Sequence, residues 1–122
     1  IQYGERFESK VPARKLNQVI MANAELVNAP TIRPSREKTG STDFGNVTFL
    51  VPGTCLRIAF VDEGTPSHSQ AFIDAGKSHA AHDAIVCAAK IIAMSAYDLI
   101  STPSVAEDVK AEFLQNRKQM ED

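Results

Sequence analysis

The sequence predicts an α/β fold, with a partial sheet of a few strands packed against three main helices, as in one half of a larger sheet domain. Two runs, 47–51 and 56–61, are rich in β-branched and aromatic residues, which is typical of strands. Two longer stretches, 12–28 and 79–100, carry apolar residues at helical spacing. Strands and long helices that mix within one short chain indicate α/β architecture.

The first predicted helix covers residues 12–28. Apolar side chains recur every three or four residues from Leu16 to Val27, with Asn23 as the polar exception. Pro12 suits a first helical turn, where its missing N–H is not needed. Pro30 disfavours helix at the residue before it, so we expect the helix to end near Asn28.

The two predicted strands follow a long loop over residues 29–46. Pro52 and Gly53 close the first run, and an Asp-Glu-Gly turn at 62–64 closes the second. The second run is apolar apart from Arg57, which favours a mostly buried strand in a sheet covered on both faces.

The strongest predicted helix covers residues 79–100. Its charged residues step by seven and eight positions along a narrow stripe, and the rest of its surface is mostly apolar, which predicts a largely buried helix. Ser104 and Glu107 have the spacing of a capping box and predict a further helix to about residue 118. The predicted core contains Leu16, Val19, Ile58, Phe60, Ile85, Ile92, Leu99 and Phe113.

Composition limits the class of protein. With 122 residues, the chain is expected to form a single domain, 1–122, or a fragment of a larger one. Thirteen Lys and Arg against fifteen Asp and Glu argue against a nucleic-acid binder. No uninterrupted apolar run approaches the roughly 18 residues that a membrane span needs, so no membrane partner is expected. Cys55 and Cys87 show no CxxC spacing, which favours a reducing cytoplasm.

Three groups of residues could carry chemistry, and each has a plainer interpretation. His68 follows the second predicted strand and could bind a metal, or could be an ordinary surface histidine. The glycine-rich stretch 40–47 could let the backbone approach a ligand, or could be an N-capped turn that enters a strand. His79 and His82 stand three residues apart on a predicted helix, where two solvated side chains are the simpler interpretation.

Family resemblance rests on three stretches in a fixed order. Residues 40–47 read GSTDFGNV and are followed by Val51-Pro52, residues 68–72 read HSQAF, and two helical stretches, 88–99 and 109–113, close the chain. These stretches resemble the GSTDxGNV, H-S/T-x-x-F and closing helices of M20-family metallopeptidases, on the amidohydrolase branch with aminobenzoyl-glutamate hydrolase-like proteins. The resemblance runs from about Tyr3 to Phe113 and matches the C-terminal part of the catalytic domain.

This resemblance implies a hydrolase with two divalent metals, usually zinc and in some relatives manganese. Such enzymes cleave an amide bond next to a carboxylate, so the expected substrate is a small acyl-amino acid or dipeptide-like molecule. A metal-bridging water would be the nucleophile, with a glutamate as general base. His68 matches the family's last metal-ligand histidine, while Gly40, Ser41 and Thr42 match a loop beside the substrate. The complete protein is expected to be a cytoplasmic homo-oligomer.

The remaining metal ligands and the general base of the family belong to upstream segments that this chain does not contain. A catalytic zinc site takes about three protein ligands, so the 122 residues alone are expected to be inactive. The alternative is a non-catalytic module that binds a partner or small ligand through the 40–46 and 64–72 loops.

Overall fold

The computed structural model describes residues 8–33, 40 and 42–121, and within these ranges the regular secondary structure is α-helix, joined by irregular segments. The helices are α1 (Arg14–Leu26), α2 (Phe44–Thr48), α3 (Gln70–Ala75), α4 (His79–Ser101) and α5 (Pro103–Glu121). No strand forms in the described ranges, so the predicted α/β fold with a partial sheet is wrong. The helices predicted over 12–28, 79–100 and 104–118 correspond to α1, α4 and α5.

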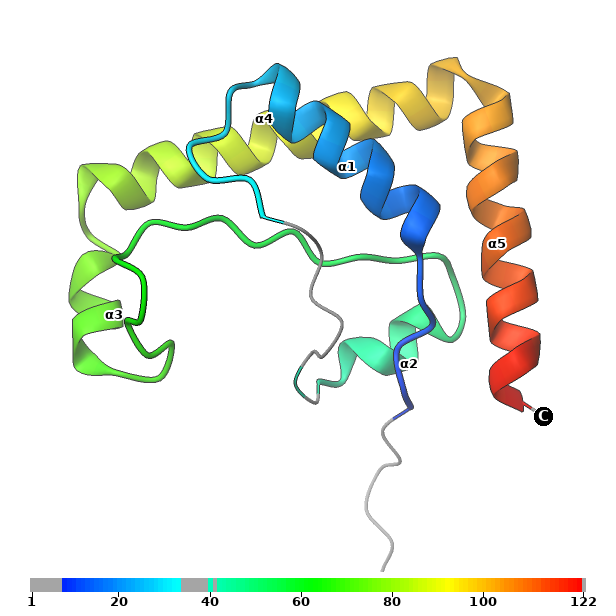
Figure 1. Ribbon diagram of the computed structural model, residues 1–122, viewed down its shortest axis with the longest axis horizontal. Helices are drawn as coiled ribbons and strands as arrows, with labels where there is room; N and C mark the ends of the chain where they lie inside the picture. Colours follow the sequence, from blue (N-terminus) through cyan, green and yellow to red (C-terminus); the bar gives the residue numbers. More distant parts are fainter. Residues whose placement is uncertain (1–7, 34–39, 41, 122) are drawn as a thin grey trace, which may run out of the picture.

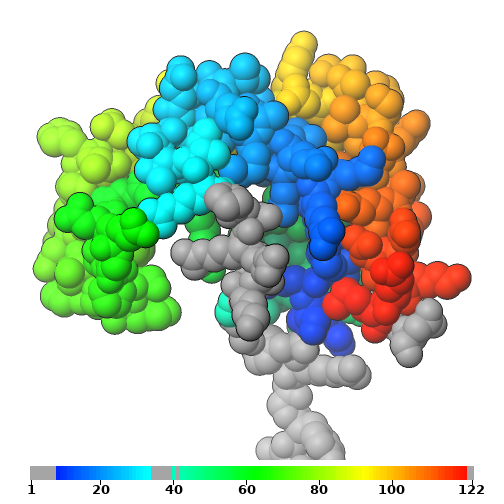
Figure 2. Space-filling view, in the orientation of Figure 1, coloured from blue at the N-terminus to red at the C-terminus, as the bar shows by residue number. Residues whose placement is uncertain are grey.

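The three long helices form an arch. α4 runs along its top, α1 lies across α4, and α5 turns away at the far end (Figure 1). α1 packs on both α4 and α5, and α4 also contacts α5. In the space-filling view, α3 and the start of α4 form one end of the molecule, α5 with the end of α4 forms the other, and α1 lies between them (Figure 2). The buried apolar residues are Val11, Ala13, Ala24, Ala81, Ala84, Ile91, Val109 and Phe113.

The first predicted strand, 47–51, is part of a helical turn. Its first two residues end α2, and the amides of Leu50 and Val51 continue the turn by donating to the carbonyl of Val47, at 3.0 and 3.1 Å. The hydroxyl of Thr48 donates to the carbonyl of Gly45 at 2.9 Å and accepts the backbone N–H of Val11 at 3.1 Å. These tertiary contacts favour a helix despite the β propensity of the sequence.

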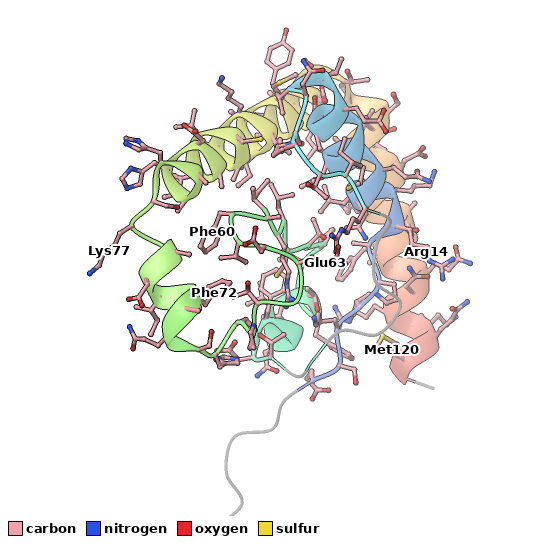
Figure 3. The ribbon with its side chains drawn as sticks, turned by 60° about the vertical axis from the view of Figure 1, so that its left-hand side comes forward. Arg14, Phe60, Glu63, Phe72, Lys77 and Met120 are labelled. Carbon is pink, nitrogen blue, oxygen red and sulfur yellow. The ribbon has the colours of Figure 1, made fainter. Side chains whose placement is uncertain are left out.

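The second predicted strand, 56–61, is irregular backbone that forms no sheet. Side-chain burial alternates along residues 54–60, with even-numbered residues half-buried and odd-numbered ones exposed. The segment passes inside the arch (Figures 1 and 3). Within the described part of the chain, its backbone N–H groups donate no backbone hydrogen bond. The segment therefore has no neighbouring strand to pair with, despite its β-rich composition.

Contacts with α5 and the local backbone set the ends of α1. The carboxylate of Glu112 on α5 accepts the backbone N–H of Lys15 at 2.9 Å, which satisfies a donor in the first turn of α1. At the other end Asn28 has a positive φ of 53°, and the N–H of Ala29 donates to the carbonyl of Ala24 at 3.0 Å. This left-handed cap ends the helix where Pro30 had predicted.

A buried asparagine joins α1 to α4. Asn23 is 2% exposed, and its side-chain amide donates to Oγ of Ser95 at 3.1 Å and to Oδ2 of Asp98 at 2.7 Å. The Ser95 hydroxyl in turn donates to the carbonyl of Ile91 at 2.8 Å. Because buried polar groups are costly without partners, this network fixes how the two helices meet.

The predicted core is only partly correct. Phe113 is buried, and Leu16, Val19, Ile58, Phe60 and Leu99 are half-buried. Ile85 and Ile92 are 66% and 55% exposed, because α1 covers a neighbouring face of α4. By length and composition α4 could cross a membrane, a test that core helices of soluble proteins also pass.

Candidate functional site

The candidate residues lie in two loops that lead into different short helices. Gly40 and Thr42 precede α2, His68 lies in the turn before α3, and Ser41 falls outside the described residues. α2 and α3 stand at opposite ends of the irregular segment that contains residues 54–60 (Figure 1). Among the residues that the structure describes, no hydrogen bond or ion pair joins these two loops directly.

Hydrogen bonds from Ser69 set the turn that carries His68. The Ser69 hydroxyl donates to the carbonyl of Pro66 at 2.7 Å and accepts the N–H of Phe72 at 3.2 Å, so it N-caps α3. The Phe60 and Phe72 rings meet edge to face with their centroids 4.9 Å apart, and this contact holds α3 against the segment 54–60 (Figure 3). The turn is therefore fixed on both sides.

The imidazole of His68 is exposed on this turn. No described residue gives it a hydrogen bond or an ion pair. An exposed, uncommitted imidazole is able to bind a metal, and it fits an ordinary surface histidine equally well.

In the front half of GSTDFGNV the described residues are Gly40, Thr42 and Asp43, and Thr42 contacts the start of α2. A Cβ added to Gly40 would meet no atom of a described residue within 4 Å. The half-buried Thr42 accepts the N–H of Phe44 at 3.3 Å through its hydroxyl, which also donates to Asp43 at 3.3 Å. The N-cap residue of α2 is Asp43, whose side chain makes no capping hydrogen bond, and the turn enters a helix rather than the predicted strand.

The back half of the same motif has a structural role that the sequence does not reveal. A Cβ on Gly45 would lie 1.8 Å from the carbonyl oxygen of Glu8, so only glycine fits there. Next to it, Oδ1 of Asn46 accepts the N–H of Glu8 at 2.8 Å. With Thr48 bound to Val11, these residues fasten the segment before α1 onto α2. Contacts between residues almost 40 positions apart leave no local signal in the sequence.

The described residues do not form a metal site on their own. Nowhere in the described ranges do three His, Cys, Asp or Glu side chains come together in a group that could hold a metal ion. His79 and His82 are exposed at the start of α4, which agrees with the interpretation as solvated side chains. Both cysteines are free thiols, with Cys55 exposed and Cys87 half-buried.

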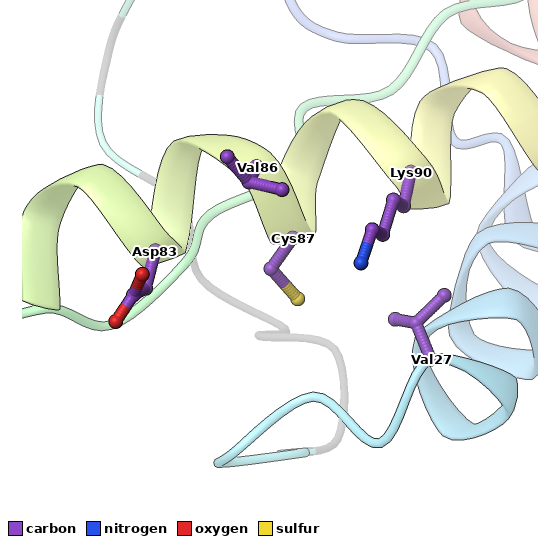
Figure 4. Close-up of a pocket in the computed structure, with 5 residues that line it drawn as sticks. All are labelled: Val27, Asp83, Val86, Cys87 and Lys90. Carbon is purple, nitrogen blue, oxygen red and sulfur yellow. The ribbon is translucent and has the colours of Figure 1, made fainter.

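The described surface has two open hollows, and one of them lies beside a candidate loop. One, of about 270 Å³, is lined by Phe60, Val61, Asp62, Thr65, Ala71 and Ala75 beside the His68 turn. The other, of about 240 Å³, lies between the end of α1 and α4 and is lined by Val27, Asp83, Val86, Cys87 and Lys90 (Figure 4). Neither is lined by Gly40, Thr42 or His68.

Comparison with known proteins identifies two similar sequences. This chain resembles Xaa-Arg dipeptidases. It is 33% identical to the mouse (Mus musculus) protein over 100 residues, which cover 82% of this chain and 21% of the dipeptidase. It is 32% identical to the human (Homo sapiens) protein over 101 residues, with the same coverage. No family model and no solved structure matches the chain.

The chain spans about a fifth of the length of these curated dipeptidases. The similarity supports a relationship to M20-type peptidases in broad terms. It does not single out the aminobenzoyl-glutamate hydrolase-like branch that the sequence motifs suggested.

Proposed function

We propose that this chain is the C-terminal portion of the catalytic domain of a dipeptidase-like hydrolase, which cleaves an amide bond next to a carboxylate. The observation that carries the proposal is the 33% identity to a named dipeptidase over 82% of the chain. The substrate class we propose is a dipeptide or a small acyl-amino acid. No described residue lies within 4 Å of a Cβ built on Gly40, which supports an approach of such a ligand to its backbone.

We further propose that His68 supplies one ligand to a metal centre whose other ligands lie outside this chain. Its support is an exposed imidazole on a turn that Ser69 fixes, in the segment HSQAF. A catalytic zinc site takes about three protein ligands, and the described residues offer no such group. We therefore assign no catalytic step to these residues, and we expect no hydrolysis from the isolated chain with added zinc.

The test replaces His68 with alanine in the longest natural polypeptide that contains this chain. Metal content is measured by mass spectrometry, and turnover is measured on dipeptides that end in arginine, the class named by the relatives. We expect His68→Ala to lower both, with turnover falling more than about 100-fold, because residues that only support metal ligands already contribute about 10–100-fold.

His82→Ala is the matched control, since His82 is also exposed and stands at the start of α4. It should keep full metal content and turnover. If His68→Ala did the same, the ligand assignment would be wrong. A natural polypeptide that starts near Ile1 and binds a small ligand without hydrolysing it would favour the non-catalytic module instead.

A further inference from the structure

One side of α4 is apolar and uncovered. We call it the outer face of α4 and define it by residues that recur every three or four positions and therefore line up on a helix: Ile85, Ala89, Ile92, Ala96 and Ile100. All five are exposed, and the isoleucines retain 66%, 55% and 82% of their accessible surface. An exposed stripe of this length is unusual for a soluble protein without a partner.

The face beside it is already packed. Ala84, Ile91 and Ser95 are buried, in part by α1. The charged residues of α4, Asp83, Lys90 and Asp98, fall outside the outer face. A helix that is apolar on two faces is typical of one covered from two sides. Yet only 17% of its most apolar 18-residue stretch is buried.

We propose that the outer face of α4 is the interface on which the remainder of a longer dipeptidase-like polypeptide packs. This inference rests on the proposed function and adds the position of the contact. The dipeptidases that this chain resembles are about four times its length, so the proposed occupant is a large polypeptide and not a small ligand. An uncharged stripe fits an apolar protein surface, which would bury it by the hydrophobic effect.

The packed face argues against a lipid bilayer as the occupant. The amide of Asn23 on α1 donates to Ser95 and to the carboxylate of Asp98 on α4. If α4 crossed a membrane alone, it would lose this partner and carry Asp98, Asp83 and Lys90 into or close to hydrocarbon, where ionisable groups are costly.

The first experiment compares Ile92→Lys with Leu114→Lys. Leu114 on α5 is 53% exposed, which matches the 55% of Ile92. In the isolated chain both substitutions should shift Tm by less than about 2 °C, because both side chains face water. In the longest natural polypeptide, Ile92→Lys should lower Tm by at least about 5 °C, because it places an unpaired charge in an apolar interface. Leu114→Lys should remain neutral there, and equal effects of the two would overturn the proposal.

The second experiment does not depend on a destabilised variant. Ala96→Cys and the control Gln115→Cys, both exposed, are labelled with a maleimide after Cys55→Ser and Cys87→Ala remove the natural thiols. Both should react at similar rates in the isolated chain. In the longest natural polypeptide, position 96 should react at least about tenfold more slowly, because a buried site reacts only when the structure opens.

Each other occupant gives its own result. Flotation of the longest polypeptide with phosphatidylcholine–phosphatidylglycerol vesicles, lost in Ile92→Lys, would indicate a membrane contact and overturn the proposal. A dimer that dissociates in Ile92→Lys, with protection that rises with concentration, would indicate a second copy and overturn it too. If position 96 is protected from the maleimide but the polypeptide hydrolyses no dipeptide, the proposed function is rejected and the interface is supported. If the polypeptide hydrolyses dipeptides but position 96 reacts freely, the interface is rejected and the proposed function is supported.

Discussion

Replacing Gly45 with alanine tests whether the back half of GSTDFGNV holds the fold together. Gly45 lies inside α2 with an ordinary helical backbone, so alanine would by itself favour the helix by up to about 1 kcal/mol. The added Cβ would stand 1.8 Å from the carbonyl oxygen of Glu8 and 2.9 Å from its carbonyl carbon. Both are backbone atoms, so the segment before α1 has to move away from α2.

That movement breaks two hydrogen bonds. The N–H of Glu8 loses Oδ1 of Asn46, and the N–H of Val11 loses the hydroxyl of Thr48, at a cost of about 0.5–1.5 kcal/mol each. The second bond is buried, and an unsatisfied group there costs about 1–3 kcal/mol more. After the gain in helix propensity, the net loss of unfolding free energy is about 1–5 kcal/mol.

Urea unfolding followed by circular dichroism at 222 nm measures this loss. Gly40→Ala is the matched control, because its Cβ would meet no described residue within 4 Å, and it should stay within about 0.5 kcal/mol of the parent chain. Thr48→Val removes the same acceptor without a clash and should cost about 1–3 kcal/mol. A Gly45→Ala chain as stable as the parent would refute the reasoning.

Two further substitutions separate a buried polar contact from an exposed one. Asn23→Ala should lower the unfolding free energy by about 2–4 kcal/mol, since it removes hydrogen bonds to a hydroxyl and to a carboxylate in a buried position. The same urea titration measures it, and a loss below about 0.5 kcal/mol would show that the network contributes little. Lys15→Ala should cost less than about 1 kcal/mol, because its 2.9 Å ion pair with Asp108 is exposed, with 46% and 66% of the two side chains accessible. That small cost should shrink further in 1 M NaCl, and a salt-independent loss would contradict a purely electrostatic role.

Long helices could be predicted from the sequence because their signals are local. The apolar spacing from Leu16 to Val27, with Pro30 beyond it, predicted α1 to within two residues at each end. The cap that ends α1 is a left-handed Asn28, a residue type that tolerates this backbone. The carboxylate of Glu112 that satisfies the first turn comes from α5, and no local pattern announces it.

Predicted strands failed for a different reason. Val, Ile and Phe favour extended backbone only where a neighbouring strand offers hydrogen bonds and a surface to pack on. Residues 47–51 instead form a helical turn. The hydroxyl of Thr48 within this run donates to a carbonyl of the same turn and accepts the N–H of Val11. Along 54–60 the alternation of exposed and half-buried side chains remains, without a paired strand in the described ranges.

The sequence identified the motifs of the candidate site, but it did not predict how their residues are arranged in space. HSQAF was expected to be a loop, and the structure adds a short helix capped by Ser69, which leaves His68 exposed. GSTDFGNV was interpreted as a ligand loop or a capped turn, and the structure adds that Gly45 and Asn46, in its back half, hold the segment before α1. The clash that makes Gly45 indispensable involves a backbone carbonyl 37 residues away, which only tertiary structure can reveal.

The burial of α4 depends on how many other elements pack against it, which its own sequence does not specify. The sequence correctly predicts a helix over 79–100, but the prediction that it is largely buried is wrong: Ile91 is completely buried, and only Ala81, Ala84 and Ser95 are buried with it. Ile85, Ile92 and Ile100 keep 55–82% of their surface, and full burial of such a side chain is worth about 1.5–3 kcal/mol. Covering these three would therefore contribute several kcal/mol, which is comparable with the roughly 5–15 kcal/mol that stabilises a whole domain. A free-energy difference of that size makes the outer face of α4 the place where the longest natural polypeptide and the isolated chain should differ most in stability.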